Sequence, residues 1–385
     1  MNVAPYASTL KLMRLLQSGT RTEELMTLPA REGDNAHLLM RMALLFNIYG
    51  KTGQAWELQH EALQLRRHYS MAADRTPAAI RLLLILKAGF MLDNTPVDFL
   101  IEGMDVACEL LYVTPDQPLP TALPEHDVAF VALGHFARNA SLIERIRPML
   151  EGSGKPVLNM PRPEFSFERD ALNQLLQGIP GLVVPPTRTI SRNALRNLAL
   201  DGDALPLIVR PLRSQAGKGL QRLLHGSDID AYLSAQAEAL FYVAPYVDYR
   251  SPDGLYRKCR LLLLRGVPWV CHLAISSHWV VHYQSAGMED SAAKREEEER
   301  FMAGSEQGFC RRHGAALKEI AARIGIDYVV IDCAETQDGQ LLFFEADNVS
   351  IIHATDPLDM FPYKQVQMSK VFDAFRALLD SVTSA

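Results

Sequence analysis

The chain has 385 residues, of which 48% are hydrophobic and 22% are charged, and its formal net charge is -6. This composition is typical of a globular protein with two or three domains. The acidic balance argues against general nucleic-acid binding, which needs a basic surface. No apolar run approaches the roughly 20 residues of a membrane span, and residues 1–20 lack the pattern of a signal peptide. We therefore expect a cytoplasmic protein that has neither nucleic acid nor a membrane as a partner.

The cysteines indicate neither a zinc ribbon nor a disulfide framework, because the sequence contains no C-x-x-C pair. We expect reduced, mostly buried thiols. The five residues are Cys108, Cys259, Cys271, Cys310 and Cys333.

The N-terminal region to about residue 73 has an entirely helical pattern. Small, aromatic and turn residues fall where a helical hairpin needs them, namely Ala43, Phe46, Gly50, Ala55 and Ala62. This run resembles one tetratricopeptide repeat, although such repeats need neighbours to bury their faces. We predict a helical segment over residues 1–76. It is either an ordinary pair of packed helices or a module for a homodimer or a protein partner.

A small α/β domain is predicted over residues 77–160. Short apolar runs, typical of strands buried on both faces, occur at 81–86, 107–113, 128–133 and 156–159. An amphipathic helix at 141–150 separates two of them, so the sheet is expected to be largely parallel. The loop after the third run contains His135, which is either a ligand contact or, as we favour, a solvent-facing histidine. No G-x-G-x-x-G motif supports a dinucleotide fold.

A glycine-rich loop follows the predicted strand 207–211. Gly217, Lys218 and Gly219 would present backbone N–H groups together with a cation, which suits a polyphosphate. The alternative is an ordinary surface turn.

A basic strand is predicted over 255–264, where Lys258 and Arg260 share one face. Because the other face leads into the core, these two side chains must meet water or anions. The charged run K-R-E-E-E-E-R at 294–300 is interpreted as the solvated face of a helix.

The C-terminal hairpin at 326–353 carries the acidic residues of the sequence's main candidate site. Asp338-Gly339 between two apolar runs predicts a two-residue type I′ turn, and this register places Asp332 opposite Glu345. Asp347 follows on the same face. Opposed carboxylates destabilise a sheet, so we expect a positive group between them, in the first instance Mg²⁺. The alternative is a hairpin with solvated acids on its wet face.

The motifs follow one another along the chain in a definite order: a helix with Arg-Asp, a strand ending V-R-P, the Gly-Lys-Gly loop, the segment A-P-Y-V, the basic strand and the hairpin D-x12-E-A-D-N. This order resembles the ATP-grasp superfamily. The likeness is greatest to its glutathione-synthetase-like and D-alanine:D-alanine-ligase-like branches. It covers about residues 80–360 and implies an α/β fold with an ATP-grasp domain at 161–385 and a lid at about 191–239. Similar enzymes use ATP and Mg²⁺, with Mn²⁺ as a substitute, to join a small carboxylic acid to an amine through an acyl phosphate.

The resemblance also implies roles for single residues. The metal ligands would be Asp332 and Glu345, with either Asp347 or Asn348 as the third. Arg260 would contact the acyl phosphate. The phosphates would be bound by Arg169, Arg210, Gly217, Lys218 and Gly219. Arginine at positions 169 and 210 replaces the family's lysine, which keeps the charge and changes the geometry.

The segment Ala244-Pro245-Tyr246-Val247 matches the hinge that binds adenine through a backbone carbonyl and the N–H of Val247, with Asp248 placed for a ribose hydroxyl. Pro245 is tolerated there because its carbonyl remains. Lys258 is a candidate substrate contact, and His282 and His353 are each either a substrate contact or a structural histidine. Two other functions stay open at this point, a small-molecule kinase and a non-catalytic nucleotide-binding scaffold.

Overall fold

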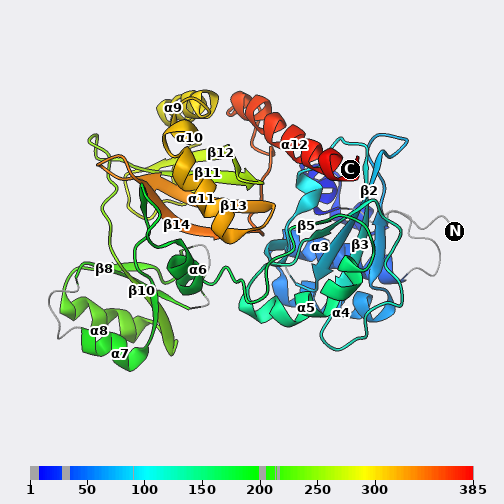
Figure 1. Ribbon diagram of the computed structural model, residues 1–385, viewed down its shortest axis with the longest axis horizontal. Helices are drawn as coiled ribbons and strands as arrows, with labels where there is room; N and C mark the ends of the chain where they lie inside the picture. Colours follow the sequence, from blue (N-terminus) through cyan, green and yellow to red (C-terminus); the bar gives the residue numbers. More distant parts are fainter. Residues whose placement is uncertain are drawn as a thin grey trace.

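The computed structural model is an elongated molecule with three β-sheets (Figure 1). The described residues are 8–27, 35–89, 91–198, 205–212, 214 and 217–384. The mixed α/β fold class predicted from the sequence is confirmed. Within these ranges, no helix combines the length and apolar character that crossing a membrane requires.

The first sheet has the strand order β1-β3-β2-β4-β5. Strands β2 to β5 are parallel and β1 is antiparallel, so the predicted, largely parallel sheet is confirmed. The strands are β1 (His68–Met71), β2 (Ile80–Lys87), β3 (Val106–Val113), β4 (Val128–Val131) and β5 (Val157–Leu158). The helical segments after β2 are η1 (Met91–Asp93), η2 (Val97–Phe99), η3 (Ala137–Asn139) and α5 (Ala140–Glu151).

Among the described residues, the helices that precede this sheet are α1 (Thr9–Gln17), α2 (Thr22–Thr27), α3 (Asn35–Ile48) and α4 (Thr52–Leu65). Helices α3 and α4 form the expected hairpin, with Ala43, Ala55 and Ala62 buried between packed faces. Gly50 in the connection has φ +69°, which favours glycine. The likeness to a tetratricopeptide repeat stays a prediction.

The prediction of an entirely helical N-terminus to residue 73 is wrong at its end. Residues 68–71 form β1, which pairs with β3 as an edge strand of the first sheet. Tertiary pairing therefore overrides the helical pattern there. Apolar residues of α1 to α4 share one core with β2 and β3, and the division of the chain near residues 76 and 160 stays a prediction.

The rest of the chain forms a large sheet, β12-β11-β13-β14-β6, and a small sheet, β7-β10-β8-β9. The strands are β6 (Leu182–Val183), β7 (Arg188–Ser191), β8 (Leu207–Pro211), β9 (Gln221–Leu223), β10 (Leu240–Pro245), β11 (Tyr256–Leu264), β12 (Val267–Ser276), β13 (Tyr328–Glu335) and β14 (Leu341–Asp347). The helices are α6 (Arg169–Leu176), α7 (Arg192–Asn197), α8 (Gly226–Ala235), η6 (Tyr283–Ser285), α9 (Ala292–Gly304), α10 (Phe309–Arg312), α11 (Gly314–Ile324) and α12 (Pro362–Thr383). The small sheet with α7 and α8 lies below the large one in Figure 1.

Helix α12 ties the large sheet to the first sheet, and Figure 1 shows it running from one to the other. Its Phe375 packs edge-on against Phe130 of β4 and Tyr328 of β13, with ring centroids 6.1 Å and 6.3 Å away. Its Arg376 donates to Asp105 at 3.1 Å. The two sheets therefore share one buried core.

The β13–β14 hairpin differs from its predicted turn. The loop has three residues, 337–339, because the N–H of Thr336 donates to the carbonyl of Gln340 at 2.9 Å. Gly339 has φ +80° and donates to Thr336 at 3.0 Å, whereas Asp338 does not have a positive φ. This is a type I turn followed by a glycine bulge, so the type I′ turn is wrong. A second bulge, at Phe344, restores the register beyond it.

Candidate functional site

One row of side chains crosses four strands of the large sheet. His272 of β12 pairs with Arg260 of β11, Arg260 pairs with Asp332 of β13, and Asp332 pairs with Glu345 of β14. Directly paired residues of an antiparallel sheet project from the same face, so four titratable groups lie side by side. Register shifts next to Arg260 and Asp332 border the row, and bulges commonly re-aim side chains at sites.

Asp332 is held by cations of its own chain. Its carboxylate accepts from Arg260 Nε at 2.7 Å, Arg260 Nη2 at 3.0 Å and Lys258 Nζ at 2.8 Å. Burial by itself would raise the pKa of Asp332, but the charges of Arg260 and Lys258 outweigh it and hold this pKa far below its usual range. The positive groups expected beside the hairpin's carboxylates therefore include two side chains of β11.

Glu345 faces two arginines from other elements. Arg169, the first residue of α6, donates to its carboxylate. Burial opposes ionisation of Glu345, but the charges of Arg169, Lys258 and Arg210 together outweigh it and lower the Glu345 pKa. Arg210 at the end of β8 is 9% exposed and donates to Ser214 Oγ at 3.1 Å. Burial, with repulsion from Arg169, lowers the pKa of Arg210 to about 10. Arg169 therefore contacts this acid, whereas Arg210 affects it through its charge.

Asp347 and Asn348 differ in their surroundings. Asp347 accepts from the N–H groups of Val349 and Ser350 at 2.8 Å and 2.6 Å, and burial raises its pKa. Asn348 is fully buried. Its Oδ1 accepts from the N–H of His135 at 3.0 Å, and its Nδ2 donates to the carbonyl of Leu133 at 2.9 Å. Asn348 therefore fastens the end of β14 to the loop after β4.

The acceptor positions that hydrogen bonds leave open on Asp332 and Glu345 decide whether these acids fit a divalent cation. In the described part of the chain, no three His, Cys, Asp or Glu side chains are grouped as a ready metal site. Asp332 accepts three hydrogen bonds, whereas one arginine donates to Glu345. A carboxylate offers about four acceptor positions, so Glu345 and the remaining position of Asp332 supply oxygens that fit one hard cation.

The glycine loop has a shape that only glycine permits at Gly219. This residue has φ +66°, and a Cβ there would lie 2.7 Å from the ring Cδ of Pro211. Tyr232 of α8 donates to its carbonyl at 2.8 Å. Gly217 has φ +72° and Lys218 is exposed. Residues 199–204, 213 and 215–216 of the predicted lid lie outside the described residues.

The predicted adenine hinge ends β10. Ala244 and Pro245 pair with β8, and the N–H of Tyr246 donates to the carbonyl of Pro206 at 3.0 Å. Asp248 forms an ion pair with Arg250 at 2.9 Å. Burial opposes ionisation of Asp248, but hydrogen bonds from Arg250 lower its pKa.

An aromatic cluster beside the hinge was missed from the sequence. Tyr246 meets Trp279 edge-on at 5.8 Å, and the guanidinium of Arg222 lies 4.6 Å from the Tyr246 ring centroid. Nothing in the local pattern of these residues distinguishes them from an ordinary core or surface.

Two predicted substrate histidines lie within electrostatic reach of the row. Burial lowers the pKa of His282, with further effects from Lys258 and Arg260. Burial also lowers the pKa of His353, whose Nδ1 accepts from the N–H of Thr355 at 3.2 Å. Both imidazoles are therefore expected to be neutral near pH 7.

The interpretation of His135 as a solvent-facing residue is wrong. It is 1% exposed, it stacks on Phe167 with ring centroids 6.2 Å apart, and burial lowers its pKa to about 3. Among the described residues, neither ring nitrogen has a hydrogen-bond partner. The loop is buried because Phe167, just before α6, and Asn348, just after β14, pack against it, and sequence pattern does not report such tertiary coverage.

A buried polar network beside the row was also missed, and it corrects the interpretation of residues 294–300. Glu298, predicted to be solvated, is fully buried. It accepts from Tyr283 and Tyr363 at 2.8 Å and 2.6 Å and from the N–H of Leu273 at 3.0 Å. Lys364 of α12 lies 3.6 Å from it. The sequence pattern did not reveal this burial, because Glu298 is one of four consecutive glutamates and only the packing of α9 on β12 distinguishes it from the others.

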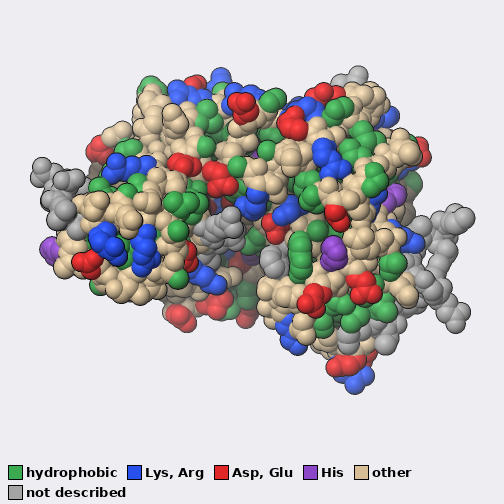
Figure 2. All heavy atoms as spheres, turned by 90° about the horizontal axis from the view of Figure 1, so that it is seen from below, with side chains coloured by type: hydrophobic (Ala, Val, Ile, Leu, Met, Phe, Trp, Pro, Cys, Tyr) green, Lys and Arg blue, Asp and Glu red, His purple; other side chains and the backbone are tan. Residues whose placement is uncertain are grey.

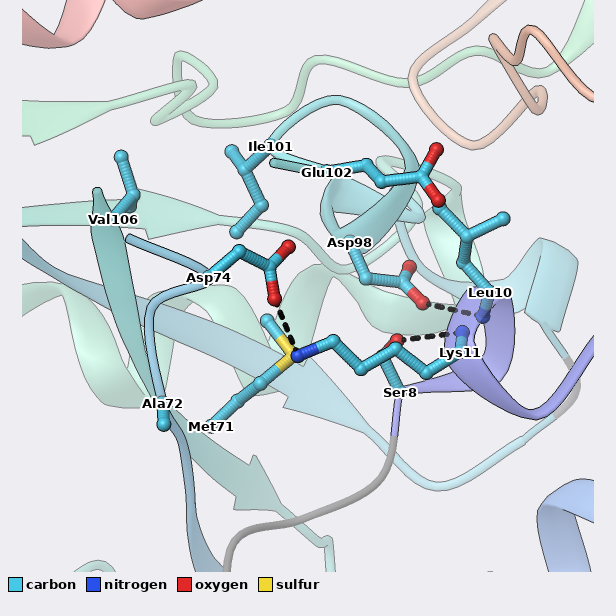
Figure 3. Close-up of a pocket in the computed structure, with 10 residues that line it drawn as sticks. All are labelled: Ser8, Leu10, Lys11, Met71, Ala72, Asp74, Asp98, Ile101, Glu102 and Val106. Atoms are coloured by element: carbon cyan, nitrogen blue, oxygen red, sulfur yellow. Dashed lines mark hydrogen bonds and ion pairs between the residues drawn. The ribbon is translucent and has the colours of Figure 1, made fainter. Parts of the chain in front are cut away.

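The surface view in Figure 2 shows a hollow between the two halves of the molecule, with basic and acidic side chains at its rim. A cavity of about 80 Å³ lies elsewhere, beside α1 and the first sheet. Figure 3 shows its smaller neighbour, where Lys11 pairs with Asp74 at 2.6 Å and Asp98 accepts from the N–H of Leu10 at 3.1 Å. Their residues contribute no group to the charged row.

No family model matches the chain, and no curated protein matches it in sequence. Among solved structures, the chain is similar to the VanG D-Ala:D-Ser ligase from Enterococcus faecalis (13% identity, TM-score 0.47, 78% of this chain and 99% of that chain). It is also similar to a D-alanine–D-alanine ligase from Bacillus anthracis complexed with ATP (14%, 0.46, 79% and 97%). A RimK domain ATP-grasp protein from Sphaerobacter thermophilus is a third such structure (17%, 0.43, 76% and 98%). At these scores and identities, the likenesses carry no argument about function.

Proposed function

We propose that this protein is an ATP-dependent carboxylate–amine ligase of the ATP-grasp type, which joins a small carboxylic acid to an amine through an acyl phosphate. The observation that carries the proposal is the contact of Arg169 with Glu345 beside the mostly buried Arg210, whose pKa is lowered in part by the charge of Arg169. These two cations repel each other, and a polyphosphate placed between them would relieve that repulsion. The order of motifs in the sequence supports the same assignment.

The nucleotide would be held between the small and large sheets. Arg169 and Arg210 would bind its phosphates with planar, charged donors. The loop at 217–219 would add backbone N–H groups and the Lys218 ammonium. Adenine would contact the backbone at Pro245 and Val247, and Asp248 the ribose.

Mg²⁺, or Mn²⁺ in its place, would be held by Glu345 and Asp332, with Asp347 nearer to these acids along the strand face than Asn348. When bound, this cation would neutralise charge on the transferring phosphate. The amide of Asn348 would keep its present role, which is to hold the hairpin end against the first sheet.

Arg260 would contact the acyl phosphate, because Asp332 fixes the direction of its guanidinium. Burial lowers the pKa of Arg260, but the charge and hydrogen bonds of Asp332, with the charges of Asp347 and Glu345, outweigh this effect and raise it, so Arg260 stays charged. The amine attacks an already activated carbonyl, so the reaction needs no protein nucleophile. His282 and His353, both neutral near pH 7, would face the acceptor.

The test is incubation with ATP, Mg²⁺ and a panel of carboxylic acids and amines, with ADP, phosphate and the organic product measured separately. The ligase predicts ADP and phosphate release only when one acid and one amine are both present, together with an amide. A phosphorylated product that accumulates without an amine would assign a kinase. ATP binding without turnover across the panel would favour a scaffold.

A further inference from the structure

Lys258 lies beside the acids of the large sheet and contacts Asp332. It lies two residues before Arg260 on the same face of β11, and its side chain is 14% exposed. Its Nζ donates to Asp332 Oδ2 at 2.8 Å, while Arg260 occupies both oxygens of that carboxylate. The charge of Lys258 also contributes to the lowered pKa of Glu345 across the row. One ammonium therefore compensates two carboxylates.

This arrangement uses carboxylate oxygens that a pair of divalent cations would need as ligands. Two-metal phosphoryl-transfer sites hold their ions about 3.5–4 Å apart and share carboxylates between them. Here Lys258 and Arg260 already take most of the acceptor positions of Asp332. Three acids, Asp332, Glu345 and Asp347, thus face three cations of the chain before any metal arrives, namely Lys258, Arg260 and Arg169.

We propose that Lys258 takes the place that a second divalent cation would have in a two-metal phosphoryl-transfer site, so that this site binds ATP or ADP with a single metal ion, held by Glu345 and the remaining position of Asp332. The inference rests on the proposed function, because it concerns the same nucleotide site. An ammonium is a compact point charge with three donors, which allows it to neutralise a carboxylate and a phosphate oxygen together. The proposal assigns Lys258 to nucleotide binding and removes it from the acid or amine pocket.

The experiment counts bound Mn²⁺ by electron paramagnetic resonance in the presence of saturating ADP, with full-length protein. The parent should hold about one Mn²⁺ per nucleotide complex, whereas Lys258→Ala should hold about two, because Asp332 regains free oxygens. Lys258→Arg, which keeps the charge, should hold about one. Lys370→Ala on the exposed side of α12 is the matched control and should not differ from the parent.

Thermal unfolding of each variant shows whether it is folded, and Lys258→Arg supplies a charge-preserving comparison if the alanine variant is unstable. Two Mn²⁺ per complex in the parent would overturn the inference and leave the ligase proposal standing. The same count of one in Lys258→Ala would also overturn it. Failure of ADP to bind the parent at any Mn²⁺ concentration would overturn both.

Discussion

Replacing Arg210 should have opposite effects on stability and on nucleotide affinity. Its side chain is 9% exposed and its hydrogen bonds go to Ser214, a neutral residue. The pKa falls from its ordinary 12.5 to about 10. At about 1.4 kcal/mol per pKa unit, burial of this charge and its repulsion from Arg169 therefore cost the fold about 3 kcal/mol.

Arg210→Met keeps most of the volume and removes that charge. Without nucleotide, we expect the variant to unfold at a temperature equal to or above that of the parent. With nucleotide, it loses a charge-assisted contact of about 1.5–3 kcal/mol, so the ATP dissociation constant should rise about tenfold to a hundredfold. Arg210→Lys should recover part of this loss, because a point charge replaces a planar fork.

Calorimetric titration of ATP at fixed Mg²⁺ and salt, combined with thermal unfolding, measures both effects. Arg188→Met, at an exposed position on β7 of the same small sheet, is the control and should change neither quantity. Equal ATP affinities for the parent and both Arg210 variants would refute the reasoning. A clear loss of stability without nucleotide would show that the buried charge is compensated by the fold.

Three further predictions concern other parts of the site. Glu345→Gln should lower ADP release far more than tenfold, that is, by well over ~1.4 kcal/mol of barrier, with unchanged circular dichroism; a smaller loss would contradict a metal role for the hairpin. Gly219→Ala should destabilise the protein by more than the ~1–2 kcal/mol of a left-handed alanine, because its Cβ would clash with the ring of Pro211. Gly254→Ala is the control, since Gly254 has a similar φ of +84° and open space around it. Equal unfolding temperatures of the two variants would mean that the clash with Pro211 costs nothing. Asn348→Ala leaves a buried N–H and a buried carbonyl without their partner, at about 1–3 kcal/mol each, so hydrogen exchange at residues 133–135 should accelerate; unchanged exchange would mean that other contacts hold this joint.

The facing of Asp332 and Glu345 could be predicted from the sequence even though the turn between their strands could not. The predicted pairing came from the register of a two-residue turn. The three-residue turn shifts the register by one position, and the bulge at Phe344 shifts it back. The acids therefore pair as predicted because the two departures cancel, and the period-two alternation of a strand places Asp347 on the face of Glu345.

The segments with strong periodicity, including β2 to β4, α5, β8 and β11, were also determined locally. Their apolar runs fit one secondary structure, so neighbouring elements had little to decide. The same reasoning placed Lys258 and Arg260 on one face, as their shared contact with Asp332 bears out.

Only the tertiary structure decided which charges meet and which are buried. Arg169 reaches Glu345 from a helix far away in the sequence, and Glu298 is buried where α9 packs on β12. His135 is covered by Phe167, just before α6, and by Asn348, just after β14. These contacts join residues that are remote along the chain. Local pattern fixes the direction of a side chain relative to its own helix or strand, but its partners depend on how those elements pack, and packing energy is shared over the whole core.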